Sequence, residues 1–156
     1  MGKTSTKTNK TIYQHMTKDA IQESIIEEFS IFDDWLDKYD YLISLSDELP
    51  AIDPAKRNDT FLIEGCQSRV WVAAEMRDGK VYYTADSDAI ITKGIVALLI
   101  RVMNGRTAEE AANIDLYFID AIGLGENLSP TRSNGLRAMI AQMKLYALVF
   151  SKQNNN

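Results

Sequence analysis

Residues 61–85 read FLIEGCQSRVWVAAEMRDGKVYYTA and predict a small antiparallel sheet. The stretch contains an apolar run at 61–63, an alternating run at 69–76 and a third run after residue 79. Alternation of apolar and polar side chains is the period of a strand with one buried face. Asp78-Gly79 predicts a hairpin turn, because both residues tolerate a positive φ. About three such strands are stable once helices cover one face.

The only cysteine of the chain, Cys66, lies between the first two of these runs. Gly65 precedes it and can take backbone angles that other residues resist, so the pattern predicts a tight loop with the thiol at its tip. A free cysteine often packs as a small apolar core residue, but Gly, Gln, Ser and Arg are poor core neighbours. A reactive thiol is therefore favoured, and an inert structural cysteine stays open as the alternative.

Composition and charge limit the class of protein. The chain has 156 residues, of which 46% are hydrophobic and 25% charged, as expected for one globular domain. Its net charge of -5 argues against a nucleic-acid-binding protein, which would normally carry a basic surface. A single cysteine forms no internal disulfide, and the start of the chain lacks the apolar stretch of a secretory signal. A cytoplasmic protein without membrane contact is therefore expected.

The two ends of the chain show no apolar period. Residues 1–18 are rich in Lys, Thr and Asn and are predicted to form a flexible N-terminal arm, with a frayed tail at 152–156. A single domain is expected at 19–151. His15, the only histidine, lies in the arm, where a metal ligand or catalytic base would lack the rigid scaffold that it needs.

Helical patterns surround the predicted sheet and indicate an α+β fold, in which a small antiparallel sheet of about three strands packs against several helices. Apolar residues recur at helical spacing between residues 21 and 43. The run at 89–104 is apolar almost all round and ends before Gly105, which predicts a central buried helix. It is too short and too charged for a membrane span, which needs roughly 20 apolar residues.

Capping residues mark the later helices. Thr107 and Glu110 fit a capping box, and Asp115 is predicted to cap the next helix. Ser129-Pro130 predicts the start of the last helix, with proline in its first turn.

Two acids and one arginine outside the cysteine loop are candidate site residues. Asp86 and Asp88 precede the central helix, and N-capping of that helix explains them better than paired acids for catalysis or metal binding. Arg132 lies in the first turn of the last helix, where the dipole does not favour a cation. Either it is a solvated surface residue, the commoner case, or its guanidinium lies near Cys66 and stabilises an anionic sulfur or a partner's carboxylate.

Three blocks of the sequence resemble the signature blocks of the SufE family of sulfur-acceptor proteins, in the same order and spacing. They are GCQSRVW at 65–71, DSDA at 86–89 with Lys93-Gly94, and LSPTRSNGL at 128–136. The similarity runs from about residue 25 to residue 150. Arg69 stands where many relatives have glutamine, which bears on partner choice more than on chemistry.

This resemblance implies a SufE/IscU-like fold and a SufS- or CsdA-like cysteine desulfurase as partner. It implies that the protein accepts the persulfide sulfur of that enzyme on Cys66. By taking the sulfur it stimulates the desulfurase, and it then passes the sulfur to the iron–sulfur cluster scaffold. The chain is then a sulfur-transfer partner more than a stand-alone enzyme. No cofactor or metal of its own is expected, since pyridoxal phosphate belongs to the desulfurase. The residues expected to support or dock the reacting thiol are Gly65, Gln67, Ser68, Arg69, Asp86, Asp88 and Arg132.

Other functions fit the sequence less well. An iron–sulfur scaffold or metal-binding module of the same fold needs about four cysteine-type ligands, and the chain has one cysteine and one histidine. A cysteine hydrolase needs a histidine base in the folded part. A peroxidatic thiol has no support beyond the lone cysteine.

Overall fold

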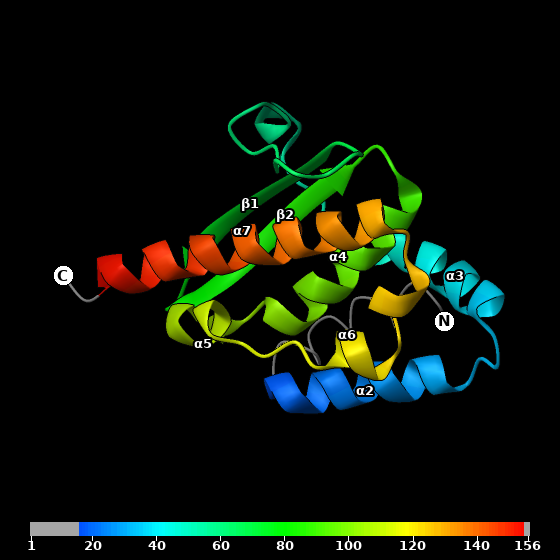
Figure 1. The fold of residues 1–156 in the computed structure, drawn as a ribbon. Helices are drawn as coiled ribbons and strands as arrows, with labels where there is room; N and C mark the ends of the chain where they lie inside the picture. Colours follow the sequence, from blue (N-terminus) through cyan, green and yellow to red (C-terminus); the bar gives the residue numbers. More distant parts are fainter. Residues whose placement is uncertain (1–15, 155–156) are drawn as a thin grey trace, which may run out of the picture.

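A hairpin of two long strands organises the computed structural model, which describes residues 16–154 (Figure 1). β1 (Val70–Arg77) pairs antiparallel with β2 (Lys80–Ser87) along its whole length. The turn is formed by Asp78 and Gly79, whose φ angles are positive, at 52° and 78°. The hairpin and its turn are as the sequence predicted, and the architecture is an α+β fold with a three-stranded antiparallel sheet.

The third strand differs from the expected one. β3 (Arg106–Thr107) pairs with the beginning of β2. The apolar run at 61–63 makes only an isolated antiparallel bridge, between Leu62 and Trp71 on the outer edge of β1. The pairing stops there because the chain turns away at residue 64 to form the cysteine loop.

Helices cover one face of the hairpin. In chain order they are α2 (Lys18–Ser30), α3 (Trp35–Ser44), α4 (Ile90–Met103), α5 (Ala108–Ala112), α6 (Phe118–Ala121) and α7 (Pro130–Asn154), with the short 3-10 turns η1 (Leu45–Glu48), η2 (Pro54–Lys56) and η3 (Gly125–Asn127). α4 and α7 contact the sheet, and α2 and α3 pack against α4 (Figure 1). In residues 16–154, no helix has the length and apolar character needed to cross a membrane.

The predicted ends of the domain can be compared only in part with the structure. Lys18, assigned to the arm, is the first residue of α2, and α7 continues through residues 152–154, where a frayed tail was expected. The rest of the arm, with His15, and residues 155–156 fall outside the part of the chain that the structure describes.

α4 is the central buried helix that its sequence predicted, and most of its side chains are buried. Gly105 follows it with a φ of 80°. Gly94 lies where α3 crosses α4 most closely. A Cβ at this position would lie 2.9 Å from the Leu42 carbonyl carbon and closer still to its oxygen. Only glycine therefore allows the two helix backbones to approach in this way.

Two of the three caps predicted for the helices after α4 are present. Thr107 and Glu110 form the capping box of α5, and Ser129 Oγ accepts a hydrogen bond from the Arg132 N–H at the start of α7.

The third predicted cap, Asp115, is wrong. α6 begins after Tyr117 without a side-chain cap. The buried side chain of Gln22 takes this place: its Oε1 accepts from the Phe118 N–H at 3.1 Å, and its Nε2 donates to the Asp115 carbonyl at 3.0 Å. Gln22 lies 96 residues from Phe118 and 93 from Asp115 along the chain, so no local sequence rule predicts these two bonds.

Residues 51–62, here called the strap, cross the other face of the hairpin and carry η2 (Figure 1). Ala51 pairs with Ala85 on the edge of β2, and Leu62 pairs with Trp71 on the edge of β1. A second hydrophobic cluster lies under the strap and contains Ile52, Trp71 and Ala73 with Phe61 and Leu62 packed against them. The first half of β1 is therefore buried on both faces, where the sequence predicted one buried face.

Candidate functional site

Residues 64–69, the Cys66 loop, connect the strap to β1. The Ile63 N–H donates to the Val70 carbonyl at 2.8 Å, so the two ends of the loop are held together. Gly65 has a φ of 90°, which side chains rarely tolerate, and this explains the glycine at the turn. Cys66 follows it, and its thiol is free and half-buried.

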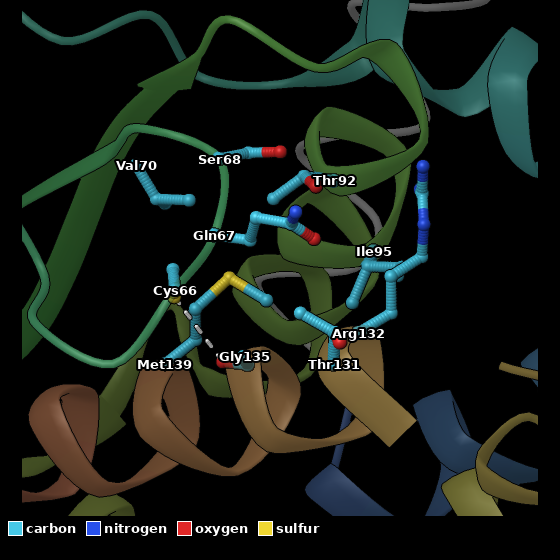
Figure 2. Close-up of a pocket in the computed structure, with 10 residues that line it drawn as sticks. All are labelled: Cys66, Gln67, Ser68, Val70, Thr92, Ile95, Thr131, Arg132, Gly135 and Met139. Carbon is cyan, nitrogen blue, oxygen red and sulfur yellow. Dashed lines mark hydrogen bonds between the residues drawn. The ribbon is translucent and has the colours of Figure 1, made fainter. Parts of the chain in front are cut away.

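The Cys66 side chain lies against the beginning of α7. Its Sγ is 3.5 Å from the carbonyl oxygen of Gly135, to which the thiol donates (Figure 2). A thiol is a weak donor, so this contact holds the loop closed with little energy. A Cβ at Gly135 would lie 3.5 Å from the sulfur, an ordinary van der Waals contact, so the thiol packs directly against this turn of α7. The thiol is thus tucked against a helix in the resting loop.

A cavity of about 50 Å³ opens beside Cys66 (Figure 2). Its walls come from the Cys66 loop with the start of β1, from α4 and from α7, and consist of Cys66, Gln67, Ser68, Val70, Thr92, Ile95, Thr131, Arg132, Gly135 and Met139. Arg132 therefore shares a cavity with the cysteine. Figure 2 shows its guanidinium on the far side, directed away from the sulfur. In the closed loop the arginine borders the site without contacting the thiol.

Burial raises the pKa of the Cys66 thiol above its ordinary value. Desolvation has this effect because it disfavours the charged thiolate. At neutral pH the closed loop therefore holds the protonated thiol, which is the less reactive form.

This raised pKa predicts a measurable pH dependence. We expect the rate of Cys66 alkylation by iodoacetamide to rise with pH, with a midpoint above the value of about 8.5 for a free cysteine. Folding stability should fall as pH rises above that value, because the unfolded chain then releases its proton first. The rate is measured from pH 6 to pH 11 on the folded protein and in urea, and a folded midpoint at or below the unfolded one would contradict the assignment.

Asp88 holds the base of the Cys66 loop. α4 begins after Ala89 with no side-chain cap, so the predicted capping role of the two acids is wrong. Asp88 Oδ1 accepts from the Arg69 N–H at 3.0 Å, and the Asp88 N–H donates to the Arg69 carbonyl at 3.2 Å. Ser87 Oγ donates to the same carbonyl at 2.7 Å. These three bonds fix the Arg69 backbone, while the Arg69 residue itself is exposed.

Asp86 links three parts of the fold. Its carboxylate is 3.3 Å from Arg57 of the strap and 3.3 Å from Lys93 of α4. The Arg57 guanidinium also lies 4.8 Å from the centre of the Trp71 ring. The Asp86 carboxylate thus joins the strap and α4 to β2 through two ion pairs. Within residues 16–154, no group of three or more His, Cys, Asp and Glu side chains is placed to bind a metal ion.

The structure thus separates the expected supporting residues. Gln67, Ser68 and Arg132 line the cavity with Cys66, Arg69 and Asp88 form the base of the loop, and Asp86 joins the strap to α4. Gly65 shapes the turn. The sequence interpretation missed the cavity residues Thr92, Thr131, Gly135 and Met139. Two signals were present: Gly135 and Met139 are four residues apart and so share a face of the last helix, and Thr92 is a polar residue in an apolar run.

Comparisons with known proteins identify the family of the chain. A family model described as "SufE: Fe-S metabolism associated domain" matches residues 23–147. An uncharacterized SufE-like protein of Rhizobium etli is 38% identical over 135 residues, which cover 83% of this chain and 91% of that protein. A SufE-like protein of Rhizobium meliloti, also uncharacterized, is 36% identical over 127 residues, covering 78% and 91%.

A solved structure shares the fold. The solution structure of a hypothetical protein from Thermus thermophilus superposes with a TM-score of 0.65 at 22% identity, covering 83% of this chain and 96% of that one. The family model spans most of the chain, and both relatives cover more than two thirds of it. The chain therefore belongs to the SufE family, whose domain is associated with Fe–S metabolism.

Proposed function

We propose that this protein accepts persulfide sulfur on Cys66 from a SufS- or CsdA-like cysteine desulfurase and passes it to an iron–sulfur cluster scaffold. Family membership supports the setting, Fe–S metabolism. The observation that carries the proposal is the placement of Cys66: a free thiol on a short loop, half-buried against Gly135 and bordered by a cavity.

The transfer step is a thiol exchange without net oxidation. The Cys66 thiolate attacks the outer sulfur of the desulfurase persulfide, a new S–S bond forms on Cys66, and the bond inside the donor persulfide breaks. The donor cysteine leaves as a thiolate and the outer sulfur keeps its own proton or charge. The pyridoxal phosphate that generates the persulfide belongs to the desulfurase. Removal of the sulfur frees the donor cysteine for its next turnover, and this stimulates the enzyme.

Two features of the site suit this chemistry. The weak bond to Gly135 lets the loop open when a donor docks, and an exposed thiol has a lower pKa than the tucked one. When the loop closes again, the cavity of about 50 Å³ has room for one more sulfur atom, since a single water needs only about 10–15 Å³ on the same measure. We place the reaction in the cytoplasm, where thiols stay reduced.

Intact-mass analysis tests the proposal. The purified protein is incubated with a SufS-like cysteine desulfurase and L-cysteine. We expect its mass to increase by one sulfur atom, the gain to map to the peptide containing Cys66, and dithiothreitol to remove it. A reaction without L-cysteine is the control. An unmodified Cys66 beside a desulfurase that carries its own persulfide would refute the function.

A further inference from the structure

A second hollow lies on the other side of the Cys66 loop, between the end of the strap and α7. We call it the α7 groove. Its volume is about 430 Å³. Leu62 and Ile63 line one wall, and Ala138, Ala141 and Leu145 line the other. The polar residues Asp59, Thr60, Glu64 and Gln142 complete the lining, so the groove has an apolar strip on each wall between polar side chains.

The apolar surface continues past the groove along α7. Leu145 is 50% exposed, Leu148 42% and Val149 47%. With Ala138 and Ala141 these residues follow the three- and four-residue spacing of one helix face. The opposite face of the same helix, with Leu136, Met143 and Ala147, is buried in the core. A helix that is apolar on both its core side and its solvent side presents an interaction surface.

The α7 groove is continuous with the Cys66 loop. Ile63 and Glu64 of its wall lead directly into Gly65, and a Cβ at Gly65 would lie 3.4 Å from the Cβ of Ala138. Ala138 is one helical turn from Gly135, which holds the thiol. The groove and the Cys66 cavity thus occupy neighbouring turns of α7, one on each side of the loop.

We propose that the α7 groove is a docking surface for the cysteine desulfurase and takes an apolar, basic-flanked element of that enzyme; this inference rests on the proposed function. Transfer requires the donor sulfur to come within bonding distance of Cys66, so the donor's surface must cover the residues next to the loop. The α7 groove, with its apolar residues on both walls, is a hollow among those residues. A second copy of this chain seated there would shield Cys66 from its donor.

Charge on the two sides of the loop supports this occupant and sets its orientation. The exposed acids Asp59 and Glu64 line the groove. Arg132 borders the cavity on the opposite side, and the exposed Arg69 lies at that end of the loop. A docking enzyme with basic residues facing the groove and acidic residues facing the arginines is therefore attracted in one orientation only.

The test compares Leu145→Glu and Leu148→Glu with Ile31→Glu. Ile31 is 74% exposed and lies at the turn between α2 and α3, away from the groove. Desulfurase turnover is measured against the concentration of each variant, and affinity by calorimetry. We expect Leu145→Glu in the groove and Leu148→Glu on the adjoining face of α7 to raise the half-saturating concentration and the Kd at least about tenfold, as for residues central to an interface. Ile31→Glu should match the wild type.

A charge-reversal variant tests the electrostatic contribution to desulfurase binding separately from the apolar contacts. Glu64→Lys should raise the Kd several-fold and flatten its salt dependence, whereas Glu27→Lys, at an exposed position on α2, should do neither. The variants outside the Cys66 loop should keep the wild-type melting temperature and alkylation rate of Cys66, and all variants, Glu64→Lys included, should gain one sulfur at saturating protein.

Three results would contradict either the docking role of the α7 groove or the proposed sulfur-acceptor function, and they show which of the two has failed. Unchanged affinity in Leu145→Glu and Leu148→Glu would remove the groove from the interface. Self-association of the wild type that Leu145→Glu abolishes, with unchanged desulfurase affinity, would assign the face to a second copy and reject the proposal. A wild type that binds the desulfurase but gains no sulfur would refute the proposed function, while the Kd values would still decide the groove.

Discussion

Cys66→Ser is expected to abolish sulfur transfer while leaving the fold and desulfurase binding intact. The serine hydroxyl fits the same space against the Gly135 carbonyl, so the closed loop is retained. A neutral hydroxyl without a base beside it is not a nucleophile toward a persulfide. With radiolabelled L-cysteine and a SufS-like desulfurase, we expect label on the wild type and only background on the variant.

Two controls make this result specific. Calorimetry should give the same Kd for Cys66→Ser and the wild type. Wild-type protein alkylated at Cys66 should also remain unlabelled, since the same sulfur is blocked by a different route. Label retained on the serine variant would show that the acceptor lies elsewhere.

Gly94→Ala is expected to cause the largest loss of stability among conservative single substitutions. The added methyl group would meet the backbone carbonyl of Leu42, which cannot rotate away as a side chain can. We expect the free energy of unfolding in urea to fall by about 3 kcal/mol or more, because overpacking exceeds the gain of about 1 kcal/mol from better helix propensity.

Gly125→Ala is the matched control for this substitution. A Cβ at Gly125 meets no atom within 4 Å, and stability should change by less than about 1 kcal/mol. Gly94 lies between Thr92 and Ile95, which line the Cys66 cavity, so Gly94→Ala should also change the alkylation rate of Cys66. A Gly94→Ala protein as stable as Gly125→Ala would contradict the close approach of α3 and α4.

Local patterns in the sequence were enough to predict the elements whose causes are local. The hairpin follows from the alternation in β1 and β2 and from Asp78-Gly79 between them. The capping box at Thr107 needs only a residue three positions later. α4 is recognised because its apolar residues leave no polar face.

Distant partners explain what the sequence did not predict. Asp86 obeys the local rule for a helix cap, but Arg57 and Lys93 compete for its carboxylate, and these contacts exist only in the folded chain. The strap is similar: Ala51 and Leu62 reach opposite edges of the sheet, and spacing along the chain does not encode this crossing.

The candidate site was predicted in part for the same reason. The loop and its cysteine follow from a local pattern around Gly65, and Arg132 was a candidate with two open interpretations. Its position at the Cys66 cavity depends on how α7 packs across β1, and periodicity gives the buried face of a helix without giving its neighbours. Thr131 and Met139 were not predicted as site residues because the neighbours of α7 in the fold cannot be inferred from its periodicity.

The hydrogen bond that joins Ile63 to Val70 limits how far the sulfur can travel. With both ends tethered, the tip of residues 64–69 can swing out by no more than about three extended residues, or roughly 10 Å. A donor cysteine at the bottom of a deeper channel would stay out of reach unless the strap itself detached from the sheet. Under the proposed function, the length of this tether would restrict sulfur donors to those whose thiol lies within about that depth of the surface.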